Sequence, residues 1–221
     1  MNPVIQAVIP VRGGSERVKN KNLRPFSGSN LLAIKIGQLL QVKELDAVYV
    51  SSEDPTMLEL AKELGAIPLE RDPYYATSVV PMSEVYAYMA GQMTSEHVLL
   101  THVTSPLAGA EVYRRCIEAY RNGIGQYDSL TTVSDVKDFL YQDGKPLNFD
   151  PAKKPRSQDL PEILKLTHVV SIASREMVTR TKEWFGPQVQ FVKLDATESF
   201  DIDTPLDMEI AEMLYAKRAA Q

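Results

Sequence analysis

The residues best suited to chemistry lie near the two ends of the chain. The N-terminal group is a loop rich in cations and glycine that follows a short apolar run of β-branched residues, and it contains Arg12, Gly13, Gly14, Ser15, Arg17, Lys19 and Lys21. Glycines allow unusual φ angles and let a ligand approach backbone N–H groups closely, while clustered cations match the charge of a polyphosphate. A basic loop can also be an ordinary solvated turn. Its place directly after the first buried strand favours phosphate binding, because open α/β sheets bind ligands beyond the carboxyl ends of their strands.

A pair of carboxylates forms the second group. Asp201 and Asp203 lie two residues apart in a segment that we expect to be extended, so both side chains should point to the same side. Two hard oxygen ligands in this arrangement suit Mg²⁺, which favours carboxylates together with substrate phosphates. Aspartates at this position are often only helix caps, and Pro205 does suit the first turn of a helix. Together with the basic loop, the pair is interpreted as the metal half of a nucleoside-triphosphate site.

The elements that would position these groups alternate along the chain. The expected strands are 4–11, 47–52, 66–69, 97–100, 128–133 and 188–194, and the expected helices are 31–40, 53–65, 85–93, 111–121 and 204–216. This alternation predicts an α/β fold with a parallel sheet and right-handed crossovers. The segment 134–166 interrupts it with an Asp-Gly turn signal and several prolines. Such a long irregular stretch indicates a functional excursion or a contact with a partner.

Composition narrows the class of protein. The 221 residues are expected to form one domain, 1–221, and the formal net charge of −5 argues against a nucleic-acid-coating surface. Cys116 is the only cysteine, which excludes an internal disulfide and a cysteine-based zinc cluster. The apolar N-terminal run is broken by Arg12 and is unlike a signal peptide, and every apolar run is too short for a membrane span. We therefore expect a cytoplasmic protein without a membrane partner.

The basic loop resembles the signature of the acylneuraminate cytidylyltransferases, the CMP-sugar-acid synthetases, which has the form (A/P)xRxGSKRxPxKN. The matching residues are Arg12, Gly13, Gly14, Ser15, Arg17, Lys21 and Asn22, whereas Glu16 and Lys19 replace the family's lysine and proline. The segment 198–205 is similar to the family's E(S/T)xDIDTPxD. The resemblance implies a three-layer Rossmann-like nucleotidyltransferase fold with a mostly parallel sheet. It also implies a dimerisation arm at about 135–166.

The same resemblance implies further nucleotide contacts. Arg71 and Ser83 fall on a loop that holds the cytosine base in the family, although a surface arginine and a serine at a helix start are the alternative. His102 stands where the family's LLQPTSPLR carries a glutamine that contacts base or sugar. A neutral imidazole can present one donor and one acceptor, and a structural histidine remains open.

Candidate acceptor contacts come from two segments. Thr104 and Ser105 match the TSPL part of the same family pattern. Arg156 and Gln158 lie in a segment similar to the family's RRQDLPxxY, which projects into a second subunit and helps to form its acceptor pocket. The resemblance therefore implies a homodimer with shared sites.

The activity implied is cytidylyl transfer from CTP to an acidic sugar, giving a CMP-sugar and pyrophosphate. Arg12, Lys21 and Asp203 are the candidate catalytic residues, and Asp201 and Asp203 are the candidate ligands of Mg²⁺. His102 and the absence of the family's NGA pattern at 167–169 leave open a related nucleotidyltransferase with another base or acceptor, for example one that uses GTP. Glu16 leaves open a non-catalytic homologue.

Overall fold

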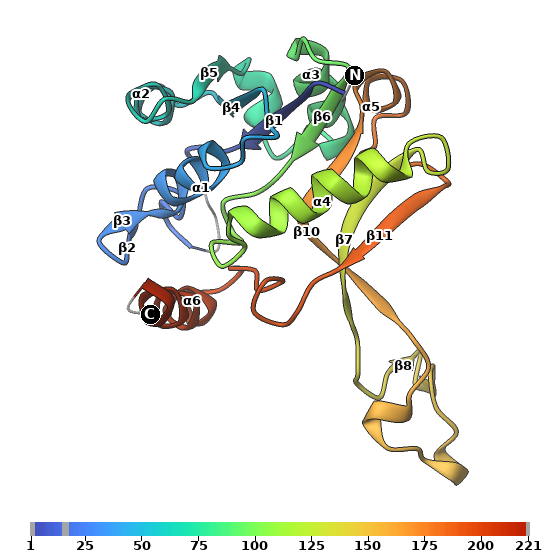
Figure 1. Ribbon diagram of the computed structural model, residues 1–221. Helices are drawn as coiled ribbons and strands as arrows, with labels where there is room; N and C mark the ends of the chain where they lie inside the picture. The colour runs from blue at the N-terminus through green and yellow to red at the C-terminus, as the bar shows by residue number, and fades with distance from the viewer. Residues whose placement is uncertain (1–2, 15–17, 220–221) are drawn as a thin grey trace.

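A central sheet organises the computed structural model, which describes residues 3–14 and 18–219 (Figure 1). Seven of the described strands form it, in the order β11-β7-β10-β6-β1-β4-β5. They are β1 (Ile5–Pro10), β4 (Ala47–Ser52), β5 (Ile67–Glu70), β6 (His97–Leu100), β7 (Ser129–Asp135), β10 (Leu164–Ser174) and β11 (Val189–Lys193). Strand β10 runs antiparallel to both of its neighbours, and the other pairings in this sheet are parallel. The expected mostly parallel sheet is confirmed.

Helices cover both faces of the sheet and complete the expected three layers. One face carries α1 (Leu31–Leu40), α2 (Pro55–Glu63) and α4 (Ala110–Gly123), and the other carries α3 (Met82–Gln92) and α5 (Arg175–Thr181). The closing helix α6 (Pro205–Ala219) lies beside the short hairpin β2 (Pro25–Phe26) and β3 (Ser29–Asn30), where the rings of Tyr215 and Phe26 meet edge to face at 5.6 Å (Figure 1).

The first strand shows why the sequence folds this way. Its residues Ile5, Ala7 and Ile9 pack into the core under α1 and α4, whereas Val8 packs into the core under α3 and α5. Successive side chains of a strand point to opposite faces, so a strand covered on both sides must be apolar throughout. All four side chains are fully buried. The loop that follows β1 is therefore anchored in the centre of the molecule.

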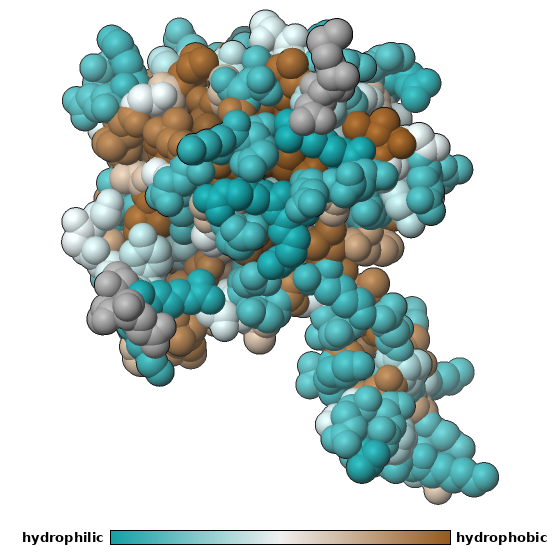
Figure 2. Space-filling view, viewed as in Figure 1, coloured by the Kyte–Doolittle hydropathy of each residue, from teal (hydrophilic) through white to brown (hydrophobic). Residues whose placement is uncertain are grey.

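The irregular segment between β7 and β10 forms an arm that projects away from the body (Figure 1). Its described elements are β8 (Tyr141–Gln142), β9 (Lys145–Pro146), η2 (Pro151–Lys153) and η3 (Ser157–Asp159). The predicted turn joins β8 to β9, with φ of 51° at Asp143 and 76° at Gly144, as a tight hairpin requires. The surface of this arm is mostly hydrophilic (Figure 2).

The sequence patterns predict β1, β4, β5, β6, β7 and β11 and the helices α1, α2, α3, α4 and α6, all within a few residues of their bounds. They assign no element to β10 or α5. Across the described part of the chain, every helix is too short or too polar to cross a membrane.

A pair of substitutions on α1 tests which face of this helix is buried. Leu39→Ala should lower the free energy of unfolding by about 2–5 kcal/mol, since it opens a cavity at a fully buried position. Leu40→Ala, at a neighbouring position that is 47% exposed, should change it by less than about 1 kcal/mol. Urea denaturation measures both values, and equal losses would contradict the assigned face.

Candidate active site

The predicted loops meet at one edge of the sheet. Strands β1 and β6 are parallel neighbours, yet the chain between them first passes through β4 and β5 on the other side of β1. Open α/β sheets bind ligands at such a switch point, beyond the carboxyl ends of the strands. A first cavity of about 530 Å³ lies there. Five residues singled out from the sequence line it, namely Arg12, Asn22, Arg71, His102 and Thr104.

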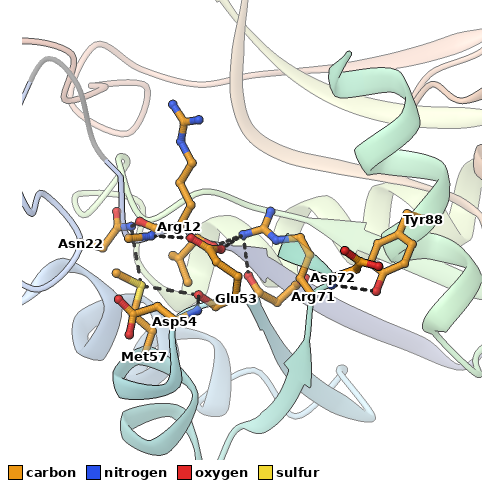
Figure 3. Close-up of polar contacts among 12 residues, drawn as sticks. Arg12, Asn22, Glu53, Asp54, Met57, Arg71, Asp72 and Tyr88 are labelled. Atoms are coloured by element: carbon orange, nitrogen blue, oxygen red, sulfur yellow. Dashed lines mark hydrogen bonds and ion pairs between the residues drawn. The ribbon is translucent and has the colours of Figure 1, made fainter. Parts of the chain in front are cut away.

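Glu53 joins the basic loop to Arg71 of this cavity (Figure 3). Its Oε1 accepts a hydrogen bond of 2.8 Å from the backbone N–H of Gly13, and its Oε2 lies 3.2 Å from Nη2 of Arg71. The Arg71 guanidinium also donates to the backbone carbonyls of Val11 and Ser51, and only 4% of the residue is exposed. Burial lowers the pKa of Arg71, and the carboxylate of Glu53 opposes that shift. The sequence patterns assign Glu53 only to the start of α2.

The glycines of the basic loop do not need unusual φ angles. Gly13 and Gly14 both lie outside the positive-φ region, so neither uses the φ freedom that glycine allows. Close approach explains Gly13 instead, because a Cβ atom there would lie 3.1 Å from Oδ2 of Asp54. Ser15, Glu16 and Arg17 fall outside the described residues.

Asn22 fixes the backbone at Arg12. Its buried amide donates a hydrogen bond of 3.0 Å to the carbonyl of Arg12. In Figure 3 the Arg12 side chain extends away from the Glu53–Arg71 pair. The cation is thereby presented at the edge of the sheet, in the lining of the first cavity.

Lys21 connects the basic loop to the carboxylate pair. Its Nζ donates a hydrogen bond of 2.8 Å to the carbonyl of Ile202, the residue between the two aspartates. The backbone N–H of Ile202 donates to the carbonyl of Thr104 at 2.9 Å. The two groups that the sequence places at opposite ends of the chain therefore meet.

Asp201 and Asp203 lie on the same side of their segment. Ile202 is fully buried, while Asp201 is exposed and Asp203 is half-buried. Both carboxylates line a second cavity of about 580 Å³ together with Ser134 and Lys165 at the base of the arm. This is the alternation that an extended segment produces.

The start of α6 fixes the backbone beside Asp203. Asp207 accepts hydrogen bonds from the backbone N–H groups of Asp203 and Thr204 and from the Thr204 hydroxyl, whose oxygen accepts from the N–H of Asp207. This reciprocal arrangement is a capping box, and Pro205 occupies the first helical turn as predicted. The hydroxyl and backbone donors of Thr204 lower the pKa of Asp207.

His102 presents a neutral imidazole to the first cavity. Burial lowers the pKa of this histidine to about 4, and the nearby positive charges of His168, Lys35 and Lys21 act in the same direction. His168 approaches from β10, at an irregularity of the pairing with β7, and has a φ of 54°. A neutral ring offers one donor and one acceptor.

The remaining candidates lie in three different settings. Ser83 occupies the first turn of α3, next to Met82 of the first cavity. Ser105 is only 1% exposed, so its side chain lies beneath the loop, and Thr104 alone remains a candidate acceptor contact there. Arg156 and Gln158 are exposed on the arm, where Arg156 pairs with Asp159 at 2.7 Å. The structure does not bring these two arm residues into either cavity.

The donor set at the carboxylate pair can be tested against Mg²⁺. Asp201 and Asp203 supply hard oxygen atoms on one side of an extended segment. In the part of the chain that the structure describes, no cluster of three or more acidic, histidine or cysteine side chains is arranged for a metal. Mg²⁺ binds through one or two carboxylates and completes its shell with waters and substrate phosphates. The residues present fit that mode of binding.

Comparison with known proteins decides the family. Residues 6–221 match the family model described as cytidylyltransferase. The chain belongs to the cytidylyltransferase family. It is 27% identical to a pseudaminic acid cytidylyltransferase of Campylobacter jejuni, over 94% of each chain. It is also 27% identical to the CMP-N,N'-diacetyllegionaminic acid synthase of Legionella pneumophila, over 95% of each chain.

Solved structures support the fold of this cytidylyltransferase. A CMP:2-keto-3-deoxy-manno-octonic acid synthetase complexed with CTP superposes with a TM-score of 0.72 at 15% identity, covering 97% of this chain and 99% of that one. A 4-diphosphocytidyl-2C-methyl-D-erythritol synthase from Anaerococcus prevotii gives 0.69 at 15% identity, covering 96% and 98%. Both share the architecture described above.

The contribution of the Glu53–Arg71 ion pair to stability can be tested in this cytidylyltransferase. Glu53→Gln should lower the free energy of unfolding by about 1–3 kcal/mol, because Arg71 stays buried without its charged partner. Glu59→Gln, at an exposed position of α2, is the matched control and should change it by less than about 0.5 kcal/mol. Chemical denaturation measures the free energy of unfolding of both variants. Indistinguishable values would show that the Glu53–Arg71 ion pair contributes nothing to stability.

Proposed function

We propose that this chain transfers the cytidylyl group of CTP to a nonulosonic acid, a sialic-acid-like sugar, and releases pyrophosphate. Its curated relatives include enzymes named for pseudaminic acid and for a legionaminic acid, which supports an acidic acceptor sugar. The observation that carries the proposal is the bond from Lys21 to Ile202, which sets the cationic loop against the carboxylate pair beside the first cavity. A Mg²⁺-bound triphosphate needs both groups at once.

The reaction is an in-line displacement at the α-phosphate, in which a protein chiefly positions groups and neutralises charge. Arg12 and Lys21 bind the triphosphate and stabilise the charge of the departing pyrophosphate. By resemblance alone, the backbone of Gly13 and Gly14 and the side chains of Ser15 and Arg17 share that role. Asn22 contributes by fixing the backbone at Arg12.

The base and the metal occupy different parts of the edge. Arg71, Ser83 and His102 lie in or beside the first cavity, where we place the cytosine. Asp201 and Asp203 would hold Mg²⁺, which would supply polarisation of the α-phosphate and a lower pKa of the attacking sugar hydroxyl. Asp203 accepts the proton of that hydroxyl. Thr104 stands between the two regions, with its carbonyl bonded to Ile202.

The acceptor sugar binds in the second cavity. A second copy of the chain completes this acceptor site. The arm leaves the body at Asp135 and returns at Leu164, both at the edge that carries the site. It carries exposed apolar residues, Tyr141 at 62% and Leu147 at 53% exposure, which a neighbouring subunit would cover. Arg156 and Gln158 then contact the acceptor of that neighbour. Because the donor is a nucleoside triphosphate, a cytoplasmic location is part of the proposal.

One observation keeps a nucleoside triphosphate other than CTP in consideration as the substrate. A neutral His102 has one hydrogen-bond donor and one hydrogen-bond acceptor at the position of the family's glutamine, so another base could bind there. Pyrophosphate release should be measured with each of the four ribonucleoside triphosphates against a panel of nonulosonic acids. Release with CTP and an acidic sugar supports the proposal, and release with another triphosphate alone would replace the donor.

The carboxylate pair provides the sharpest functional test. Asp201→Asn and Asp203→Asn should each lower kcat at least about 100-fold at millimolar Mg²⁺, because each removes an anionic ligand. Circular dichroism should show an unchanged fold. Glu209→Gln removes a carboxylate from an exposed position of α6 and should retain wild-type turnover. Near-normal activity of both aspartate variants would contradict the assignment of the metal site to this segment.

The arm can be tested by separating the two substrates. Arg156→Ala should weaken binding of the acceptor by about 10- to 100-fold, as expected for the loss of a hydrogen bond to a charge. Binding of CTP should change far less. Arg180→Ala, at an exposed position of α5, is the matched control. A fully active protein that remains monomeric in light scattering at the assay concentration would contradict a shared site.

A further inference from the structure

A lysine lies in the core directly beneath the site. Lys35 of α1 is fully buried, although lysine is almost never fully buried without a partner. Its Nζ donates hydrogen bonds to the carbonyl of Ser105 at 2.9 Å and to the hydroxyl of Tyr113 at 2.5 Å. The same atom lies 5.0 Å from the centre of the Tyr113 ring. These partners are a peptide carbonyl and a phenol, and neither carries a negative charge at neutral pH.

The network extends from Lys35 to both ends of one loop. Tyr113 shares a hydrogen bond of 2.9 Å with the hydroxyl of Thr101, which follows β6. Lys35 therefore holds the loop 101–105 directly at Ser105 and through Tyr113 at Thr101. His102 and Thr104, which lie between these two points, line the first cavity.

The loop in turn holds the carboxylate segment. The carbonyl of Thr104 accepts the N–H of Ile202, and Ile202 separates Asp201 from Asp203. A displacement of the loop would thus move the base contact and the metal ligands together. Misplacement of groups by about 1 Å can cost 100-fold in rate.

We propose that Lys35 is a positioning residue for cytidylyl transfer, whose ammonium group fixes the loop 101–105 and, through Thr104, the Asp201–Asp203 segment. This inference rests on the proposed function. An ammonium group donates to Ser105 and to Tyr113, which leaves the proton of the Tyr113 hydroxyl available to Thr101. A neutral amine can instead accept that proton, and the hydroxyl of Thr101 must then act as the donor in its bond with Tyr113. The position of the loop depends on the proton carried by Lys35.

Lys35 titrates near neutral pH, whereas Tyr113, Cys116 and His102 do not. Burial lowers the pKa of Lys35 to about 7. Burial raises the pKa of Tyr113 well above its usual range, and it raises that of Cys116, on the same helix, to about 12. The pKa of His102 is lowered to about 4. Tyr113, Cys116 and His102 are therefore all neutral between pH 6 and 9, and kcat should fall as pH rises through the pKa of Lys35.

Stability distinguishes positioning from a structural role. The pKa of Lys35 is lower in the folded chain than the usual 10.5, so the buried charge costs stability, fully below about pH 7 and progressively less toward pH 10.5. Without Lys35, the carbonyl of Ser105 still accepts from the N–H of Ala108 at 3.3 Å, and Tyr113 still bonds to Thr101. Lys35→Met should therefore raise the melting temperature near pH 7, and the gain should shrink as pH rises.

The experiment compares Lys35→Met and Tyr113→Phe with Lys43→Met, a control that removes an exposed lysine. Thermal unfolding, steady-state kinetics and calorimetric binding of CTP with Mg²⁺ are measured from pH 6 to 9. We expect Lys35→Met to melt higher yet to lose at least about tenfold in kcat, with a smaller change in KM for CTP and without the wild-type decline near pH 7. Tyr113→Phe should move that decline to lower pH, because the ammonium group loses an acceptor. Lys43→Met should match the wild type.

Two results with Lys35→Met would overturn the inference. A Lys35→Met protein with wild-type kcat and pH profile shows that the lysine positions nothing. A Lys35→Met protein that has a lower kcat and a lower melting temperature than the wild type, but the same pH dependence of kcat, shows that Lys35 has a structural role only. If Lys35→Met does not fold, an unshifted pH profile of Tyr113→Phe overturns the inference in its place. A wild type that turns over no acceptor contradicts the proposed function instead, and the pH dependence of CTP binding then tests Lys35.

Discussion

The bond from Lys21 to the carbonyl of Ile202 joins residues 181 positions apart in the chain, and the site depends on it. The basic loop follows the central strand β1, whereas the carboxylate segment follows β11 at the edge of the sheet. The segment must therefore cross back along the carboxyl edge to reach the centre. The interaction marks where that crossing ends, and it places a cation on the backbone carbonyl between the two aspartates before any substrate arrives.

Several anchors keep the crossing segment in one path. The N–H of Leu194 bonds to the carbonyl of Val133 where β11 ends. Glu198 then pairs with Arg115 of α4 through two hydrogen bonds, of 2.9 and 3.2 Å. Ile202 bonds to Thr104, and the capping box of α6 holds the backbone beside Asp203. Such a support is what a site needs when it acts by positioning rather than by a reactive side chain.

Two buried cations lie beneath the loops at the carboxyl edge of the sheet. Arg71 and Lys35 are both almost entirely buried, and each donates to a backbone carbonyl of a loop at the first cavity, that of Val11 for Arg71 and that of Ser105 for Lys35. Burying a charge costs free energy unless it is well partnered, and proteins tolerate that cost chiefly at functional sites. The polyanionic substrate that we propose would lie on the other side of these loops, where positive charge is favourable.

The sequence predicts most of the sheet because a strand buried on both faces is apolar throughout, as in β1. It also predicts the shared side of Asp201 and Asp203 from a spacing of two. It does not predict β10, because the strand is irregular between Leu166 and Ser171 and His168 has a left-handed φ, so alternation fails. Lys35 is the only charged residue of the mostly apolar helix α1, and only the packing of α1 against α4 shows its contacts.

Glu53 illustrates the same limit at the level of a single side chain. The sequence places it before a helix, where acidic residues are common, and its contacts to Gly13 and Arg71 come from loops 40 and 18 residues away. Local patterns carry no information on such pairs. What they carry is the type of chemistry, because a cationic loop after a buried strand and a pair of carboxylates are each recognisable alone.

The central claim is that the basic loop and the carboxylate pair form one site for a metal-bound triphosphate. A crystal structure with CTP and Mn²⁺, located by its anomalous scattering, tests it most directly. We predict the ion within about 2.5 Å of oxygen atoms of Asp201, Asp203 and the triphosphate, with Arg12 and Lys21 on the phosphates. A triphosphate bound in the first cavity with its metal remote from both aspartates would contradict the account.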